Sequence, residues 1–345
     1  METKKRRRVV LWIAVGAAAV VLALAATGVA MSLQRVPVGE PTRIYVPTDS
    51  SFEAVTDSLS AHHCLRNRTF FASLARLRRY PQHVKAGSYV VEPTMSTWQL
   101  LNKLYYGRQD AVRLVVGKQR TKGALAAFVA SRLEMDDASL LALLNDTATA
   151  ATLGCTVDDV MCLFIPNSYD VYWNTSAEGL LRRMKRESER FWTDRRLQQC
   201  ASLGLSPHEV QVLASIVEEE TNKDDEKPLV AAVYLNRLRK GMCLQADPTL
   251  RFAVGDFGLR RILNEHKQVE SPYNTYLHRG LPPGPICLAS PRSIDAVLQN
   301  YDCDYLYFCA REDFSGYHNF ATTLAEHLRN AERYHHALNV RKIFR

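Results

Sequence analysis

Three consecutive glutamates, Glu218, Glu219 and Glu220, end a predicted helix that begins after Ser206. Ser206 is a favoured N-cap residue, and Pro207 suits the first helical position. Successive residues of a helix are rotated by about 100°, which puts Glu220 within the arc of the apolar side chains. Glu219 falls well outside that arc and Glu218 beside it. We therefore expect Glu220, alone of the three, to point towards the core.

A carboxyl group in that position indicates a proton donor. Apolar surroundings disfavour the charged form of a carboxyl, so its pKa rises and it can hold a proton near neutral pH. A general acid needs this property. The alternative interpretation is a solvated acidic helix end without a chemical role.

The N-terminus joins a basic block to a long apolar run. Residues 4–8 carry five positive charges against Glu2, so residues 1–8 contribute 5 − 1 = 4 of the net charge of +8. Residues 9–31 contain no charged side chain and as a helix would span roughly 35 Å, enough to cross a bilayer. A cleaved signal peptide is the alternative, but its apolar region is only about 7–15 residues long.

We therefore expect residues 1–8 to be a cytoplasmic basic segment and residues 9–31 a single transmembrane helix. The chain after about residue 32 would lie outside the cytoplasm, anchored to the cell (inner) membrane by this one pass. Because the basic block flanks an anchor, the net charge gives no support to a nucleic-acid partner.

The eight cysteines form no CxxC pair and match no zinc-binding spacing. An exported region of this size does not need disulfides to fold. We expect buried free thiols, with one or two disulfide bridges left open as an alternative.

A small βααβ module is predicted after a stalk at residues 32–41. Its pattern over residues 42–110 is a strand, two helices with apolar residues on one face, and a second strand, followed by one further helix. This order resembles a LysM-like module, a small glycan-binding fold. The predicted elements cover residues 43–46, 51–59, 67–77, 85–91 and 98–105.

Residues 111–340 are predicted to form a larger mixed α+β domain, which makes the whole chain an α+β protein. It would start with a strand at 113–116, continue as mostly helical segments over 120–200, and include an aromatic-rich loop or strand at 163–172. The highly charged helix at 180–192 is expected to face solvent.

The next helix is predicted at 228–240, with Gly241 just after its end. Asp247 is placed to cap another helix that starts at Pro248.

Nearer the C-terminus, residues 305–309 are predicted to be a buried strand and residues 316–320 a loop. Thr323 and Glu326 have the spacing of a capping box for the last helix.

Polar and aromatic residues gather at the ends of these elements, where scaffolds usually present their functional groups. Aromatic rings, amides and carboxylates suit a sugar ligand. Each residue also has a plainer interpretation: Asp247 as a helix cap, Asn274 as a turn residue and His318 as a surface histidine. The clusters are centred on Glu220, on Gln245 with Asp247, on Asn274 with Tyr276, and on His318.

In combination the motifs resemble the YceG-like family of endolytic murein transglycosylases, over nearly the whole chain after the anchor. In that family the catalytic acid directly precedes a threonine at a helix end, as in Ile216-Val-Glu-Glu-Glu-Thr221. The resemblance therefore assigns the acid to Glu220. The other matching motifs are Lys85-Ala-Gly-Ser-Tyr89, Phe164-Ile-Pro-Asn-Ser-Tyr169, Asn236-Arg-Leu-Arg-Lys-Gly-Met242, Leu244-Gln-Ala-Asp-Pro-Thr249, Ser271–Tyr276, Gly280–Gly284 and Gly316-Tyr-His-Asn-Phe320.

The resemblance implies cleavage of the β-1,4 bond between MurNAc and GlcNAc in peptidoglycan, leaving a 1,6-anhydro-MurNAc end. It also implies that this step trims or terminates nascent glycan strands. It implies no metal and no cofactor. Two departures concern local substrate contacts: Asn167 stands where many members have Asp, and the turn after Gly284 lacks the usual Pro-Gly pair. The expected substrate-binding residues are Gln245, Asp247, Thr249, Asn274, Tyr276, Gly284, His318 and Phe320.

Three other functions would use these residues differently. A hydrolase would need a second carboxylate about 5–9.5 Å from the first, and Asp247 is the candidate. A glycan-binding scaffold without activity would not need Glu220. A zinc peptidase is disfavoured because His208-Glu209 begins an HExxH pattern that Val212 breaks.

The expected partners are peptidoglycan glycan strands and the cytoplasmic membrane, with the catalytic domain periplasmic or extracytoplasmic. The family resemblance also implies penicillin-binding proteins and other wall-synthesis proteins as partners.

Overall fold

A computed structural model describes residues 2–259 and 262–341 of the chain. The protein has mixed α+β structure, as expected, and folds into two compact units. The first unit comprises Met1–Val112 with Asp170–Thr175, and the second comprises Arg113–Tyr169 with Ser176–Arg345.

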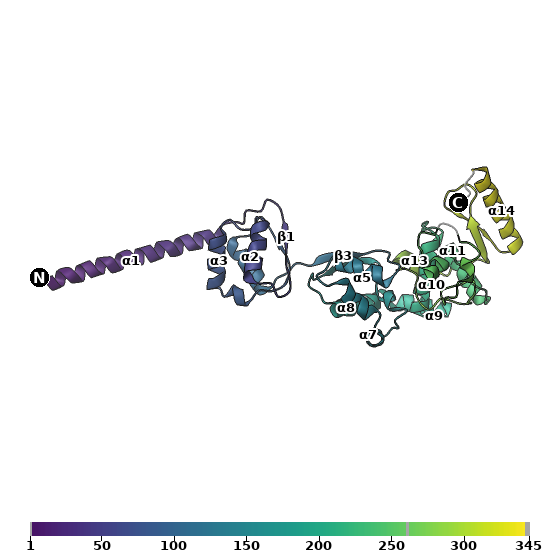
Figure 1. Cartoon of the computed structure of the whole chain (residues 1–345), viewed down its shortest axis with the longest axis horizontal. Coiled ribbons are helices and arrows are strands. Elements are labelled where there is room, and N and C mark those ends of the chain that lie inside the picture. Colours follow the sequence, from purple (N-terminus) through teal and green to yellow (C-terminus); the bar gives the residue numbers. More distant parts are fainter. Residues whose placement is uncertain (1, 260–261, 342–345) are drawn as a thin grey trace. The chain divides into compact units, whose positions relative to one another are not determined.

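The first unit begins with α1 (Glu2–Leu33), which leaves the module beside α3 (Figure 1). Its stretch Lys5–Leu33 is long and apolar enough to cross a membrane. The chain that follows, within the predicted stalk of residues 32–41, packs on the module. Arg35 forms a β-bridge with Ser96, and Val36 is 5% exposed within the core.

The module has the expected order of elements. Strands β1 and β2 pair in antiparallel fashion, with Thr42 opposite Val91. Ser51 and Asn67 accept hydrogen bonds from helical backbone N–H groups, so the first two helices start where these capping residues predict. The elements are β1 (Thr42–Val46), α2 (Phe52–Ala61), α3 (Arg68–Leu77), a 3₁₀ turn η1 (Tyr80–Gln82), β2 (Gly87–Val91) and α4 (Thr97–Tyr106).

The second unit starts with short elements. The charged helix α8 (Ala177–Phe191) is not wholly solvent-facing: Leu180, Leu181 and Met184 are buried on one side of it. It is amphipathic because most of its charges lie on the opposite side, although Glu187 is only 18% exposed. The other elements of this part are β3 (Val112–Val116), α5 (Lys122–Ala130), α6 (Asp137–Leu144), α7 (Thr147–Thr152), η2 (Val160–Leu163), β4 (Asn167–Val171), which pairs with β3, and α9 (Asp194–Leu203).

Helix α10 (Pro207–Glu220) is the central helix of this unit. All residues from Val210 to Val217 are buried, and Ser206 with Glu209 forms a complete capping box at the start. Helix α9 packs against it, and so do α11 (Lys227–Arg239), α12 (Asp247–Val254) and α13 (Pro291–Leu298). A 3₁₀ turn, η3 (His266–Gln268), follows α12. The end of α10 is therefore held from several sides.

The C-terminal part corrects two predictions. Strand β5 (Tyr307–Ala310) is half-buried: within residues 2–259 and 262–341 it pairs with β6 alone, and α14 covers this hairpin. Residues His318–Ala321 form β6, so much of the predicted loop is a strand. The last helix, α14 (Leu324–Val340), starts after Thr323, whose side chain accepts a hydrogen bond from the Glu326 N–H.

All eight cysteines are free thiols. Cys64, Cys200 and Cys287 are buried, and the other five are partly exposed. The prediction of free thiols is confirmed, but only three of the eight are buried as predicted.

Candidate active site

A cavity of about 240 Å³ lies at the end of α10. Side chains from elements far apart in the sequence surround it, and these elements include strand β5 and helices that follow α10. Most of its surface is polar. It is lined by Glu220, Tyr234, Arg237, Leu244, Gln245, Asp247, Tyr276, Phe308 and His327.

Glu220 is the last residue of α10 and is partly buried at this cavity. The hydroxyl of Tyr234 donates a hydrogen bond to Oε1 of Glu220 at 2.5 Å. Burial raises the pKa of Glu220 to about 7, and the nearby charge of Asp247 acts in the same direction. The Tyr234 hydrogen bond and the charges of Arg251 and Arg237 oppose the rise without cancelling it. A carboxyl with this pKa is partly protonated at neutral pH.

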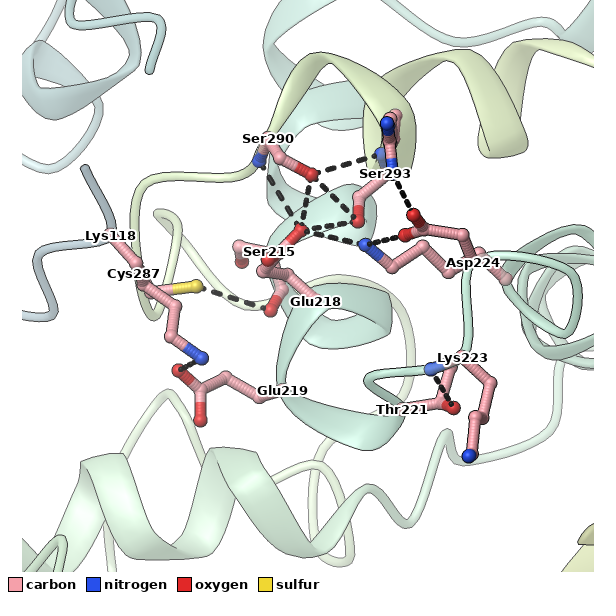
Figure 2. A network of polar contacts seen from close by, with 12 residues as sticks. Lys118, Ser215, Glu218, Glu219, Thr221, Lys223, Asp224, Cys287, Ser290 and Ser293 are labelled. Carbon is pink, nitrogen blue, oxygen red and sulfur yellow. Dashed lines mark hydrogen bonds and ion pairs between the residues drawn. The ribbon is translucent and has the colours of Figure 1, made fainter. Parts of the chain in front are cut away.

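Glu218 lies two residues before Glu220 on α10, but its surroundings are different (Figure 2). Its Oε2 accepts hydrogen bonds from the Ser290 and Ser293 hydroxyls, each at 2.5 Å, and lies 3.4 Å from Nζ of Lys227. Burial alone would favour the neutral acid, but these hydroxyls and the lysine charge hold the pKa of Glu218 below its ordinary value. Glu218 is therefore an ionised structural group.

Glu219 is likewise paired. Arg120 donates to it through Nε at 3.0 Å and Nη2 at 2.9 Å, and Nζ of Lys118 is 3.3 Å away (Figure 2 draws the lysine contact). Burial is outweighed by these cations, which lower the pKa of Glu219. Its side chain is only 10% exposed, so the helical-wheel expectation for Glu219 was wrong. The three glutamates differ in their partners and not in whether they are buried.

Asp247 faces the same cavity as Glu220. Its Oδ1 accepts a hydrogen bond from the Tyr276 hydroxyl at 2.6 Å. The N-cap position of α12 is occupied by Ala246, and Asp247 is the first helical residue, so Asp247 does not cap the helix as predicted. Its side chain is free to serve the cavity because the helix start does not use it.

Gln245 sits on a strained loop at the mouth of the cavity. Its φ is +52°, a left-handed conformation that costs a non-glycine residue free energy. The loop is held by Arg237, which donates to the Leu244 carbonyl at 2.7 Å and to the Leu306 carbonyl at 2.6 Å. Arg237 is 8% exposed and satisfied by backbone carbonyls, so its charge remains near Glu220.

Thr249 and Asn274 lie beneath the cavity and not on its surface. The Asn274 amide donates to the carbonyls of Lys267 and Val269, and its oxygen accepts from the Tyr276 N–H at 3.0 Å. Thr249 is fully buried and donates to the Ala246 carbonyl. Both residues shape the loops that carry Tyr276 and Asp247.

Gly284, His318 and Phe320 also fall outside the cavity lining. A Cβ at Gly284 would collide with the Asp158 carbonyl oxygen, which explains a glycine there. The His318 ring lies 2.9 Å from Oε2 of Glu226 through Nδ1.

His318 and Phe320 support the site from behind. The centroid of the Phe308 ring is 5.3 Å from that of His318 and 6.0 Å from that of Phe320. Since Phe308 lines the cavity, these two residues hold one of its walls in place.

The sequence-based prediction missed five lining residues: Tyr234, Arg237, Leu244, Phe308 and His327. Tyr234 and Arg237 are three residues apart on α11, which places both on one face, and this spacing was the available signal. Phe308 and His327 belong to β5 and α14, and nothing in their local sequence points to Glu220.

His327 has unusual surroundings. Its ring stacks on Tyr307 with centroids 5.3 Å apart. Burial, with the charge of Arg237, lowers the pKa of His327. Within the described part of the chain its Nδ1 is buried without a hydrogen-bond partner. A neutral histidine of this kind can bind a hydroxyl group of a ligand.

The fold and the site define a class of protein. It is an α+β protein with an N-terminal helix able to cross a membrane, and it presents one carboxyl of raised pKa in a small polar cavity with aromatic walls.

The chain belongs to the YceG-like family, whose model matches residues 44–333. It is 27% identical over 307 residues to the endolytic murein transglycosylase of Bacillus subtilis, with 84% of each chain covered. It is 26% identical to the enzyme of the same name from Streptococcus pneumoniae strain D39, covering 85% of this chain and 58% of that one. A crystal structure of a yceG-like protein from Listeria monocytogenes superimposes with a TM-score of 0.57 at 27% identity, covering 85% of this chain and 99% of that one.

Proposed function

We propose that this protein is an endolytic murein transglycosylase that cleaves the β-1,4 bond between MurNAc and GlcNAc, with Glu220 as its general acid and base. The single observation that carries the proposal is the raised pKa of Glu220 at a polar cavity, on a helix end whose two other carboxyls are paired. The relatives named for this activity support the reaction class.

The reaction needs only one carboxyl because the nucleophile comes from the substrate. Protonated Glu220 donates its proton to the glycosidic oxygen as the bond from that oxygen to C1 of MurNAc breaks. The resulting carboxylate then takes the proton of the MurNAc 6-hydroxyl as its oxygen bonds to C1. The products are a GlcNAc with a free 4-hydroxyl and a 1,6-anhydro-MurNAc end, and no water is consumed.

The other lining residues have supporting roles in this proposal. Tyr234 orients the Glu220 carboxyl through its hydrogen bond. Asp247, held by Tyr276, places a negative charge where an oxocarbenium-like state develops. Gln245 and His327 contact sugar hydroxyls, and Phe308 packs on a sugar face. Thr249, Asn274, Gly284, His318 and Phe320 position these groups.

Hydrolysis is the second candidate, because Asp247 lines the same cavity as Glu220 and could activate water. Digestion of purified peptidoglycan with the full chain in detergent, followed by mass spectrometry, separates the two. Transglycosylation leaves ends lighter by one water than the reducing ends that hydrolysis leaves.

Asp247→Asn sharpens this test because an Asn oxygen can still accept the Tyr276 hydrogen bond. We expect anhydro ends from the wild type, and reduced but measurable formation of the same ends by Asp247→Asn. Reducing ends, made by the wild type and abolished in that variant, would assign the second carboxylate and replace the transglycosylase proposal.

We also propose the membrane arrangement. Residues 1–8 would be cytoplasmic and residues 9–31 transmembrane, with the LysM-like module (42–110) and the catalytic domain (111–340) extracytoplasmic, near nascent glycan strands that the enzyme trims or terminates. The β1-α2-α3-β2 order supports the LysM-like interpretation. Penicillin-binding proteins and other wall-synthesis proteins are the proposed protein partners.

A further inference from the structure

An apolar groove joins the end of α1 to the module. It has a volume of about 560 Å³ and is lined by the last turns of α1, by α3 and by one residue of α4. Figure 1 shows α1 leaving the module next to α3. Its apolar lining residues include Val29, Leu33, Phe70, Leu74, Leu77 and Trp98.

Helix α3 has a second apolar stripe besides the one that serves the core. Phe71 and Ala75 are fully buried in the core of the module. Phe70, Leu74 and Leu77 follow the spacing i, i+4 and i+7, which puts them together on a neighbouring face, where Leu74 also packs in part against the core. Leu77 is 81% exposed, so this stripe has apolar surface that the module does not bury.

The position of α1 gives the depth of this groove. The basic block ends at Arg8, and a hydrocarbon core of about 30 Å takes up about 20 helical residues. If Val9 begins that span, it ends near Gly28. The groove residues Val29 to Leu33 then lie at the outer interface, and Trp98 beside them occupies the level at which tryptophan is enriched.

The module cannot swing away from this depth on a loose linker. Directly after α1, the Thr97 N–H donates to the Gln34 carbonyl at 3.0 Å, and Arg35 pairs with Ser96. Val36 is then buried in the module core. The groove is therefore held at the height at which α1 leaves the bilayer.

The charge around the groove fits anionic headgroups. Residues 62–83 include five arginines and no acidic residue. Arg76 and Arg78 flank Leu77, and the Arg78 guanidinium lies over the Trp98 ring, 4.9 Å from its centroid. Arginines beside exposed apolar residues are typical of surfaces that bind anionic membranes.

We propose that the α3 stripe and Trp98 dock on the outer surface of the membrane, with Leu77 and Trp98 among the headgroups and the flanking arginines on lipid phosphates. This inference rests on the proposed membrane-spanning role of α1, and it does not depend on the reaction assigned to Glu220. Its consequence is a module fixed against the bilayer.

Tryptophan quenching by brominated lipid tests this placement. The full chain carrying Trp12→Phe, which removes the tryptophan of α1, is reconstituted in vesicles of phosphatidylglycerol and phosphatidylcholine. Lipid brominated just below the headgroup is expected to quench the part of the fluorescence that Trp98 emits. In a second chain that also carries Trp98→Phe, this quenching should be absent. Leu77→Asp should weaken the quenching, whereas Leu197→Asp, a control at an exposed leucine of α9, should not.

The outcomes separate the two levels of the inference. Trp98 quenching that Leu77→Asp weakens supports the docked module. A chain that resists alkaline extraction from vesicles but shows no Trp98 quenching overturns the docking while α1 keeps its role as anchor. A chain that alkaline extraction removes overturns the anchor and the docking together, and murein cleavage by the same preparation would leave the proposed reaction intact.

Discussion

Three glutamates end α10, and their surroundings on its two sides shift their pKa values in opposite directions. On one side, Glu218 and Glu219 are surrounded by hydroxyls and cations from α11, α13 and the segment after β3 (Figure 2). On the other side, Glu220 faces a cavity and has one hydroxyl as its hydrogen-bonding partner in the described part of the chain. The first two carboxyls have lowered pKa values and are ionised at neutral pH, whereas the third has a pKa raised to about 7 and is partly protonated there.

The difference teaches that burial alone does not decide whether the pKa of a carboxyl is raised. All three carboxyls are partly buried, and burial raises the pKa of each. For Glu218 and Glu219 that effect is reversed by close partners, whereas for Glu220 the nearby Asp247 strengthens it.

The largest expected effect is on turnover. Glu220→Gln should lower kcat on peptidoglycan by at least about 10²-fold, because the proton donor is lost. Glu219→Gln, the matched control one residue away, should stay within a few-fold of the wild type. The measurement is release of anhydro products over time, with circular dichroism to show that both variants are folded. Equal losses in the two variants would contradict the division of roles.

Glu220→Gln should lower activity but raise the stability of the folded protein. The folded-state pKa of Glu220 is raised from 4.5 to about 7, so ionising it costs stability as pH rises through about 7. Glu220→Gln should therefore increase the free energy of unfolding at pH 8 by up to about 3 kcal/mol, with little gain below pH 4.5.

Glu218→Gln is the counterpart of Glu220→Gln. For both variants, urea titration at pH 4.5 and pH 8 measures the free energy of unfolding. The pKa of Glu218 is lowered, so its carboxylate contributes stability above its ordinary pKa and loses that contribution as pH falls. Its replacement leaves Lys227, which is 6% exposed, with a weaker partner and should cost about 1–3 kcal/mol at pH 8. A stabilising Glu218→Gln would remove the contrast.

The pH profile tests the state of Glu220 directly. Since the protonated form starts the reaction, kcat/KM should fall as pH rises through about 7. The Tyr234 hydrogen bond lowers the pKa of Glu220. Tyr234→Phe should therefore move this falling limb of the kcat/KM profile to higher pH and should also reduce the rate. Asp247→Asn removes a negative charge and should move it to lower pH. A limb that neither variant shifts would assign the titration to another group.

The smallest expected effect is at His327. Its lowered pKa keeps the ring neutral at pH 7, and its partnerless Nδ1 makes it a candidate for binding a sugar hydroxyl. His327→Phe can retain the stacking on Tyr307 and should raise KM roughly 2–10-fold, the value of one hydrogen bond. His336→Phe, at an exposed position of the same helix, serves as the control. An unchanged KM in His327→Phe would exclude this residue from substrate binding.

The sequence predicted the local elements well where capping residues and periodicity agree. Ser51, Asn67 and Ser206 start helices as expected, and Gly107 ends one with φ of +65°. It predicted Asp247 as a helix cap and residues 316–320 as a loop, and both predictions were wrong. A cap depends on where the chain turns, and a strand depends on a partner that pairs with it, neither of which a local pattern contains.

By itself, the sequence determined the long apolar helix, the order of elements in the module, and the helix end that carries three glutamates. These follow from short-range rules of hydrogen bonding and side-chain spacing. Only the tertiary structure decided which glutamate keeps a proton, because that depends on Arg120, Lys227 and Ser290 reaching two of them and Asp247 approaching the third. Charges act through space, and the residues that set this pKa come together only when the chain folds.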